Sequence, residues 1–431
     1  MNWGFLLGGI GRALSHRNYQ YLWLGSTASH TGRWVQRTAI MWLVWELTES
    51  GTWLGIVAFA DLFPLVIVPL VAGVFTDRLG YLQVLRATAI ISFVVGAVFA
   101  GLVALDAINI ELIVILTALL GMSDAAGSPA RLSMASQVVP RADLSSALGL
   151  NTASFNLTRI IGPAVGAAII SIADVATALA FNAATFLVFL LLLLRIPMSV
   201  SPPSGATRRG FVTELIEPLR YIVGEPSIRF VFLLLTATAL LIRPYIELVQ
   251  GFVGTVFGGG PETLGLLLGA TGFGAILSAL YLARRGRTQG LTRIVILGFI
   301  GTAIMQTAFA ATDNLWVGTA AITLLGVALL MGGVGSTTLV QNAVDQQLRA
   351  RVMAVYVSAS FGMASVGAAA LGAIADLGAG FQNALIGAAA LAAVIWLWAL
   401  TRQRAVAREL EQSASPTDPG TASQAANTRS G

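Results

Sequence analysis

Twelve long apolar segments dominate this chain of 431 residues. A helix needs roughly 20 predominantly apolar residues to cross the hydrocarbon core of a bilayer. Because a backbone in lipid must satisfy its own hydrogen bonds, a chain with this repeat is expected to be an all-α polytopic membrane protein. The expected spans are 21–45, 53–74, 85–105, 110–130, 145–170, 176–196, 229–256, 263–283, 292–311, 315–338, 352–375 and 381–401.

Composition supports this class and excludes several functions. Hydrophobic residues make up 56% of the chain and charged residues 10%, whereas soluble domains carry about 25% charged residues. Every basic residue is an arginine, so a Walker A lysine is missing and ATP is not an expected partner. With no cysteine and only His16 and His30, no metal centre, cofactor or membrane-enzyme active site is expected. The arginines lie mostly in short loops, so the high pI does not indicate nucleic acid.

The arginines also orient the spans. The N-terminal segment, every second loop and the C-terminal segment carry them, as Arg12, Arg17, Arg78, Arg141, Arg208, Arg209, Arg284, Arg285, Arg287, Arg349, Arg351, Arg402, Arg404 and Arg408. The alternate loops carry acidic residues instead, namely Glu49, Asp106, Asp174, Glu262, Asp313 and Asp376. Basic residues beside spans stay cytoplasmic. Both termini are therefore expected in the cytoplasm, and the arginine- and alanine-rich composition is typical of a bacterial inner-membrane protein from a GC-rich genome.

A long internal polar stretch divides the spans six and six. Residues 1–20 are expected to form a cytoplasmic lead-in, and residues 21–196 and 229–402 two six-helix bundles joined by a cytoplasmic linker at 197–228. Residues 403–431 are rich in Ser, Thr, Ala, Pro and Gly, which predicts a disordered cytoplasmic tail. Duplicated halves of this kind are common in secondary transporters.

A short motif closes the second span. Gly73, Asp77, Arg78 and Gly80 are spaced as Gly-x-x-x-Asp-Arg-x-Gly. This pattern resembles the loop between the second and third helices of the major facilitator superfamily, although Tyr81-Leu82 replaces the basic pair that follows in that family. The resemblance implies the major facilitator fold, with twelve transmembrane helices in two bundles.

Further motifs resemble one branch of that superfamily. The stretch 159–166, Arg-Ile-Ile-Gly-Pro-Ala-Val-Gly, is similar to the Gly-Pro motif of the family's exporters. The stretches 43–50 and 348–353 resemble the subgroup that contains bacterial enterobactin-type siderophore exporters and macrolide exporters. The resemblance covers about residues 15–400.

The resemblance implies a cytoplasmic gate built on the first motif. Asp77 would pair with an arginine or helix end in one conformation only, and Arg131 and Arg141 are the candidate partners. The competing interpretation is a simple loop turn in which Arg78 sets orientation. Farther along, Gly162 and Gly166 would let two helices approach closely, and Pro163 would favour a bend. The competing interpretation is that these residues serve ordinary helix packing without a role in gating.

Charged residues inside the spans mark the candidate binding site. A charge at mid-span costs about 2.5–3.5 kcal/mol on insertion scales, so it usually faces a cavity and has a function. The candidates for substrate binding are His30, Arg33, Trp34, Arg37, Asn156, Arg159 and Arg243. Guanidinium groups bind carboxylate or phenolate oxygens. The competing interpretation is internal ion pairing, such as Arg33 with Asp61 or Arg243 with Glu247.

Proton coupling requires a carboxylate whose charge can switch. Asp61 and Glu247 are the leading candidates and Asp124 the third, since a desolvated carboxylate takes up a proton more readily than one in water. Sodium coupling is also compatible with the sequence.

These features predict a secondary active transporter that changes no covalent bond. The expected activity is proton-coupled export of an amphipathic siderophore or drug by alternating access, with the proton gradient as energy source and a monomer as the working unit. The alternative on the same scaffold is a lipid or lysophospholipid transporter. A sensor of the same fold would bind its ligand without flux.

Overall fold

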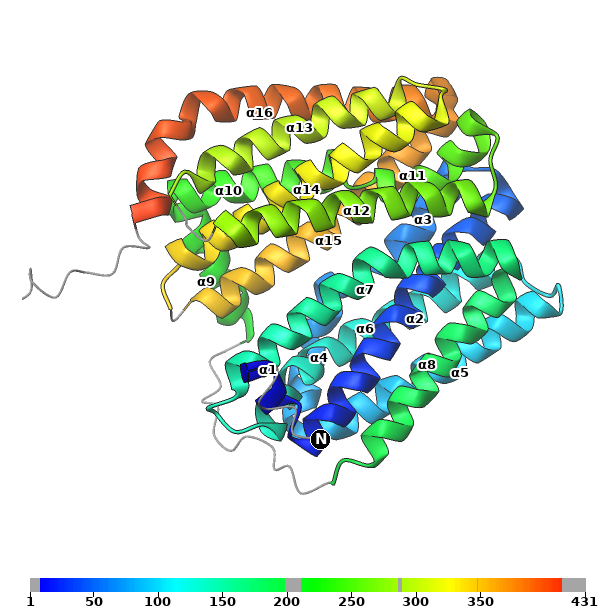
Figure 1. Ribbon diagram of the computed structural model, residues 1–431, viewed down its shortest axis with the longest axis vertical. Coiled ribbons are helices and arrows are strands. Elements are labelled where there is room, and N and C mark those ends of the chain that lie inside the picture. The colour runs from blue at the N-terminus through cyan, green and yellow to red at the C-terminus, as the bar shows by residue number, and fades with distance from the viewer. Residues whose placement is uncertain (1–7, 198–210, 286–288, 347, 413–431) are drawn as a thin grey trace, which may run out of the picture.

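The computed structural model describes residues 8–197, 211–285, 289–346 and 348–412. Within these ranges the chain is helical and forms two bundles that lie side by side (Figure 1). The first bundle contains α1 (Gly8–Ala13), α2 (Arg17–Thr48), α3 (Gly51–Leu62), α4 (Pro64–Leu79), α5 (Tyr81–Ala104), α6 (Ile110–Val138), α7 (Leu144–Ile172) and α8 (Val175–Leu194).

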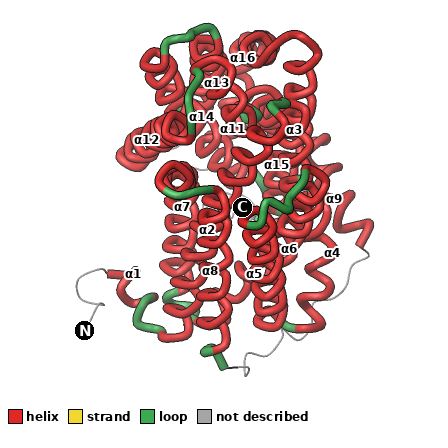
Figure 2. Tube along the Cα trace, turned by 90° about the vertical axis from the view of Figure 1, so that its right-hand side faces the viewer, coloured by secondary structure: helices red, strands yellow, loops and turns green. Residues whose placement is uncertain are grey.

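The second bundle follows a short helix, α9 (Phe211–Gly224). It contains α10 (Pro226–Ala237), η1 (Thr238–Ile242), α11 (Tyr245–Phe252), η2 (Val253–Phe257), α12 (Pro261–Arg285), α13 (Leu291–Ala310), α14 (Leu315–Ala343), α15 (Arg349–Ile374), η3 (Ala375–Ala379) and α16 (Gly380–Gln412). The end-on view in Figure 2 shows α3 of the first bundle beside α11 and α15 of the second.

Each of the twelve predicted spans coincides with one helix or one interrupted helix. Proline accounts for two interruptions, because it lacks the backbone N–H that continues the ladder. Pro64 begins α4 after the break in the second span, and Pro244 precedes α11 in the seventh. The all-α two-bundle fold predicted from the sequence is therefore confirmed.

Length and hydropathy alone identify ten spanning stretches in the described residues. The difference from twelve has two causes. The stretch Arg351–Gln403 joins two spans, which the structure separates at η3, where Gly378 has a φ of 107°. Helix α2 is less apolar than the other spans, because it carries Arg33 and Arg37 together with several uncharged polar residues.

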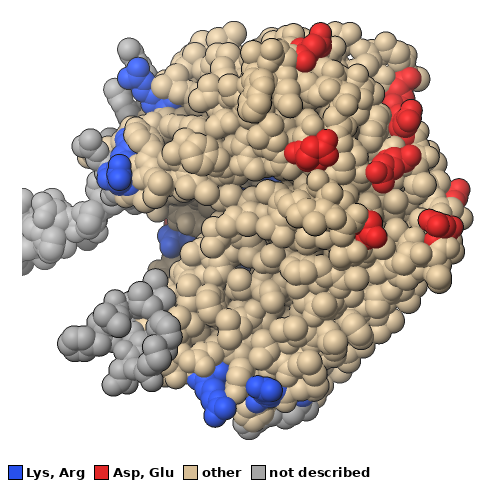
Figure 3. All heavy atoms as spheres, turned by 45° about the vertical axis from the view of Figure 1, so that its right-hand side comes forward, with Lys and Arg blue, Asp and Glu red and all other residues tan. Residues whose placement is uncertain are grey.

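The ends of the helices differ in charge. Acidic residues occupy one end of the molecule and arginines the opposite end (Figure 3). We call the end with Glu49, Asp106, Glu262, Asp313 and Asp376 the acidic face, and the end with Arg78, Arg141, Arg284 and Arg402 the arginine face. This segregation follows the alternation of loop charges in the sequence.

The two bundles pack closely at the acidic face. A Cβ on Gly55 of α3 would lie 2.6 Å from the carbonyl oxygen of Ala368 in α15, so only glycine fits there. A Cβ on Gly51, the first residue of α3, would lie 2.8 Å from the carbonyl oxygen of Gly372 in α15. At the other end the surface is hollowed between the bundles, on the side where arginines gather (Figure 3).

Two segments extend the helical structure beyond the sequence prediction. Helix α9 occupies part of the predicted linker, and its Glu217 forms an ion pair with Arg351 at the start of α15. Helix α16 continues to Gln412, past the expected start of the tail at residue 403. A tertiary contact holds this extension, because the Glu411 carboxylate accepts hydrogen bonds from the Gly290 and Thr292 N–H groups at the start of α13 (2.6 and 3.0 Å). Residues 413–431, the rest of the predicted tail, lie outside the described ranges.

Candidate functional site

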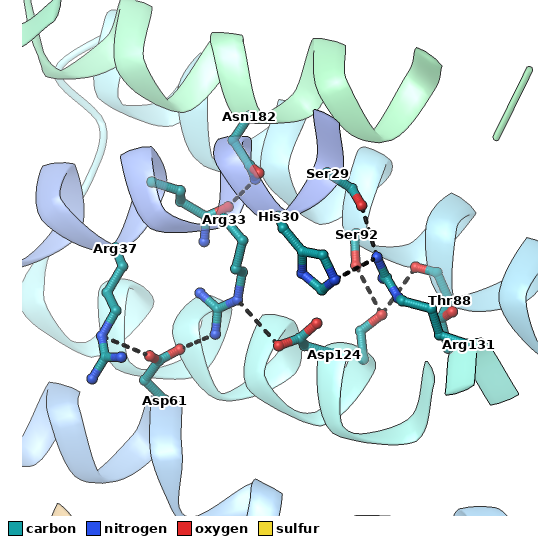
Figure 4. A network of polar contacts seen from close by, with 12 residues as sticks. Ser29, His30, Arg33, Arg37, Asp61, Thr88, Ser92, Asp124, Arg131 and Asn182 are labelled. Carbon is teal, nitrogen blue, oxygen red and sulfur yellow. Dashed lines mark hydrogen bonds and ion pairs between the residues drawn. The ribbon is translucent and has the colours of Figure 1, made fainter. Parts of the chain in front are cut away.

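A chain of ion pairs lies between α2, α3 and α6 in the first bundle (Figure 4). Arg33 and Arg37 are one turn apart on α2, so both guanidinium groups point to the same side. Arg33 forms a hydrogen-bonded ion pair with Asp61 of α3, and its Nε lies 3.8 Å from the Asp124 carboxylate of α6. Arg37 Nε lies 3.4 Å from the second oxygen of Asp61. The expected Arg33–Asp61 pair is therefore present.

The same network crosses to the second bundle. Arg37 Nη2 donates a hydrogen bond of 2.5 Å to the Glu247 carboxylate of α11. The Asp61 and Glu247 side chains are only 5% and 8% exposed, and that of Arg37 is 13% exposed. One guanidinium thus holds one carboxylate from each bundle in a largely dry environment. The alternative pair considered from sequence, Arg243 with Glu247, does not form an ion pair here because Glu247 turns to Arg37.

His30 and Arg131 form a neighbouring polar pair inside the first bundle. Arg131 of α6 donates hydrogen bonds to Ser29 Oγ (2.9 Å) and His30 Nε2 (3.3 Å), and it lies over the Phe189 ring. Since Arg131 has only donors, the Nε2 atom of His30 must accept, which requires a neutral imidazole. This geometry connects Arg131 to α2 of its own bundle rather than to the opposite bundle.

The remaining predicted binding residues line α2, α7 and the seventh span. Asn156 donates to the Thr152 carbonyl one turn earlier in α7. Trp34 lies beside Arg37, whose guanidinium carbon is 5.4 Å from the ring centroid. Arg243 donates to the Ser360 carbonyl of α15 (3.3 Å) and lies 5.2 Å from the Phe361 ring centroid. Arg159 has no hydrogen bond or ion pair with any described residue.

The motif at residues 73–80, predicted to form a gate, ends at the turn between α4 and α5. Gly80 has a φ of 88°, a conformation that favours glycine, and it caps α4 through its N–H. Arg78 and Arg141 are exposed at the arginine face, and Gly73 has open space around it. The side chain of Asp77 lies outside the described part of the structure, so the cytoplasmic gate built on it stays a prediction.

The second predicted gate element packs within the first bundle. A Cβ on Gly162 would meet Trp34 of α2, and one on Gly166 would lie 3.0 Å from the Val35 carbonyl oxygen. Pro163 lies within α7 between them. These residues thus bring α7 close to α2, while the opposite side of α7 contacts α12.

The sequence interpretation missed the polar contact that closes the acidic face. Asp376, which sequence placed among the loop acids, accepts hydrogen bonds from Ser50 Oγ (2.5 Å), Gly51 N (2.8 Å) and Thr52 N (2.8 Å). These groups form the N-terminus of α3, where free N–H groups and the helix dipole favour an anion. Burial acts to raise the pKa of Asp376, but the hydrogen bonds from Ser50 and Thr52 outweigh it and hold this pKa below its ordinary value.

A second acidic residue joins elements at the arginine face. Asp143, which precedes α7, contacts His16 Nε2 (2.9 Å) and Arg12 Nε (3.2 Å). The hydrogen bond from His16 is the main reason why the pKa of Asp143 lies below its ordinary value. This contact attaches α1 and the start of α2 to the loop between α6 and α7.

Comparison with known proteins places these features in a family. A family model described as a transmembrane secretion effector matches residues 12–431. The chain is 24% identical to the staphyloferrin A transporter of Staphylococcus aureus (strain NCTC 8325 / PS 47), covering 83% of this chain and 89% of that protein. It is 28% identical to the multidrug efflux pump Tap of Mycolicibacterium fortuitum, covering 80% of this chain and 86% of that one.

The fold has solved counterparts. A bacterial homologue of the human lysosomal transporter Spinster, in an inward-facing and occupied conformation, matches with a TM-score of 0.70 and 15% identity, covering 93% of this chain and 99% of that one. At this identity the likeness supports the fold alone. With the motif at 73–80, the two bundles and the match over residues 12–431, the chain belongs to the transmembrane secretion effector family of major facilitator superfamily transporters.

Proposed function

We propose that this protein is a proton-coupled exporter of an amphipathic small molecule, of the siderophore or drug class. The family assignment and the names of the two relatives support export of such molecules. The observation that carries the coupling is the Arg37 bridge, in which one guanidinium binds Asp61 of the first bundle and Glu247 of the second.

The bridge supports a mechanism of alternating access. Protonation of Glu247 removes its negative charge, and the ion pair that connects the two bundles is lost. A charged hydrogen bond contributes about 1.5–3 kcal/mol, which is enough to shift a balance between two conformations by about tenfold or more. Deprotonated Glu247 therefore favours the state described here, with the acidic face closed, and protonated Glu247 favours the opposite state.

We place the arginine face in the cytoplasm of a bacterial cell, because basic residues beside spans stay on that side. Both ends of the described chain, at α1 and α16, then lie in the cytoplasm, and the hollow between the bundles opens inward. In that orientation the substrate enters from the cytoplasm, and protons reach Glu247 and Asp61 when the acidic face opens. A single chain contains this whole pathway, so a monomer is a sufficient transport unit.

Transport into everted membrane vesicles tests the proposal. An imposed pH gradient, acidic inside, should drive uptake of at least one member of a panel of siderophores, macrolides and dyes, and a protonophore should abolish that uptake. Vesicles loaded with a fluorescent lysophospholipid test the lipid alternative under the same gradient. Uptake that survives the protonophore, or gradient-driven movement of the lysophospholipid alone, would contradict the proposal.

A further inference from the structure

The charges in the middle of the membrane-crossing helices do not balance. Away from both the acidic face and the arginine face, the membrane-crossing helices carry five described arginines but three described carboxylates. The arginines are Arg33, Arg37, Arg131, Arg159 and Arg243, and the carboxylates are Asp61, Asp124 and Glu247. The difference is two positive charges when all the carboxylates are ionised. Since a buried charge is normally paired, the location of this excess is informative.

The carboxylates are already engaged with the arginines of α2. Asp61 contacts both Arg33 and Arg37, Asp124 lies beside Arg33, and Glu247 binds Arg37. Arg131 has no ion pair but interacts electrostatically with Asp124. Arg159 has no carboxylate partner among the described residues. Arg243 has no ion pair with a described residue, although Glu247, which binds Arg37, acts on it electrostatically.

These two arginines come from opposite bundles and act on each other. Arg159 belongs to α7 and Arg243 to the junction between η1 and α11. Each lies within electrostatic range of the other. Arg37 adds a further positive charge near Arg243, and Glu247 adds a negative one. Both side chains are partly exposed, so a solute can reach them. The partners that Arg243 has are one backbone carbonyl and the face of an aromatic ring.

Such an arrangement disfavours close approach of the bundles at this point. Like charges repel, and the repulsion is stronger in a protein interior than in water. A guanidinium can also donate five hydrogen bonds, and a planar oxyanion satisfies them in pairs. An anion between Arg159 and Arg243 would therefore turn a repulsive contact between the bundles into an attractive one.

We propose that Arg159 and Arg243 form the recognition site for an anionic group of the exported substrate, a carboxylate or phenolate attached to an aromatic or apolar body that packs on Phe361. This inference rests on the proposed transport function and specifies its substrate class. Because the excess is two charges, a dianion matches the site better than a monoanion, and a cation is repelled.

Binding to purified protein in detergent tests the inference without any gradient. Carboxyfluorescein, an aromatic polyanion, should bind the wild-type chain, whereas ethidium, an aromatic cation, should bind at least about tenfold more weakly. Arg159→Gln and Arg243→Gln should each weaken carboxyfluorescein binding by about tenfold or more, while Arg159→Lys and Arg243→Lys should retain part of it because they keep the charge. Arg402→Gln, at an exposed position of α16, is the matched control and should bind normally.

A charge reversal separates recognition from a structural role. Arg159→Glu should pair with Arg243 across the bundles, so the ligand-free variant should have a higher Tm than Arg159→Gln and should not bind carboxyfluorescein. Size-exclusion chromatography checks that each variant is folded. The inference is overturned if folded Gln variants bind as tightly as wild type, if Arg159→Glu melts no higher than Arg159→Gln, or if lysophosphatidylglycerol binds and carboxyfluorescein does not. Carboxyfluorescein binding without gradient-driven transport would instead contradict the proposed function and leave this inference standing.

Discussion

At the scale of single residues, Arg37 is the group on which the account depends. It connects Asp61 and Glu247 through different nitrogens of one planar fork, which a lysine cannot reproduce as a point charge. Sequence indicated that Arg33, Arg37, Asp61 and Glu247 matter, because each is an ionisable residue inside an apolar span. It could not indicate that Glu247 pairs with Arg37 rather than with Arg243 four residues away, since that choice depends on how the two bundles meet.

Removing the bridge should destabilise the protein. Arg37→Gln leaves two buried carboxylates without their shared partner, and breaking a buried ion pair in this way costs about 3–5 kcal/mol. We expect a clear drop in Tm for Arg37→Gln and a smaller drop for Arg37→Lys, measured by thermal unfolding at neutral pH. If both variants have the Tm of the wild type, the bridge does not stabilise the folded protein.

The carboxylates should carry the coupling. Glu247→Gln and Asp61→Asn should each lower pH-gradient-driven transport by about tenfold or more, since a neutral side chain can no longer switch the ion pair. Energy-independent exchange of substrate should persist, because neither change removes Arg159 or Arg243. Glu111→Gln, at an exposed position on the acidic side of α6, is the control and should transport normally. Full gradient-driven transport by both variants would exclude these residues as proton carriers.

At the scale of elements, the sequence predicts the helices well and their contacts poorly. The twelve apolar segments each appear as a helix, because hydropathy and backbone hydrogen bonding act locally. The extension of α16 to Gln412 depends on a tertiary contact, because Glu411 binds the start of α13. The cap that Asp376 provides to α3 joins residues more than 300 positions apart, so no local pattern could reveal it.

The contact between α3 and α15 should set the conformational balance. Gly55→Leu would place side-chain atoms against the Ala368 backbone, and overpacking of this kind costs about 1–3 kcal/mol. We expect the variant to favour the state in which the acidic face is open. Because the chain has no native cysteine, cysteines introduced on α3 and α15 can measure this by cross-linking, and unchanged cross-linking would contradict the expectation.

The Asp376 cap should be insensitive to mild acid. A carboxylate with a lowered pKa stabilises the contact fully above the ordinary value near 4, and this stabilisation is lost only as pH falls through the lowered pKa. In the Glu247→Gln variant, cysteines introduced on either side of this contact should therefore cross-link equally at pH 8 and pH 5. Asp376→Asn should weaken the contact with the start of α3 by about 0.5–1 kcal/mol. The effect is small because the carboxylate is exposed and screened by water. A pH-dependent contact in the Glu247→Gln background would contradict this assignment.

At the scale of the whole molecule, the structure is the conformation in which the acidic face is closed, and the proposed cycle adds a second in which it is open. The bundles meet at the acidic face through glycine contacts and the Asp376 cap, and they separate toward the arginine face. Sequence predicted two bundles and the charge asymmetry of the loops. It could not predict which end is closed, because the opposite state uses the same helices and the same side chains.

Distance measurement between spin labels tests the central claim, that protonation of Glu247 controls which face is open. Labels at Leu105 and Trp316, exposed at the acidic face, report on one end, and labels at Ala142 and Ala283, exposed at the arginine face, report on the other. Acidification should lengthen the first distance and shorten the second, and Glu247→Gln should produce the same distances at neutral pH. Distances that stay the same at both pH values, or that respond to acid as strongly in Glu247→Gln as in the wild type, would contradict it.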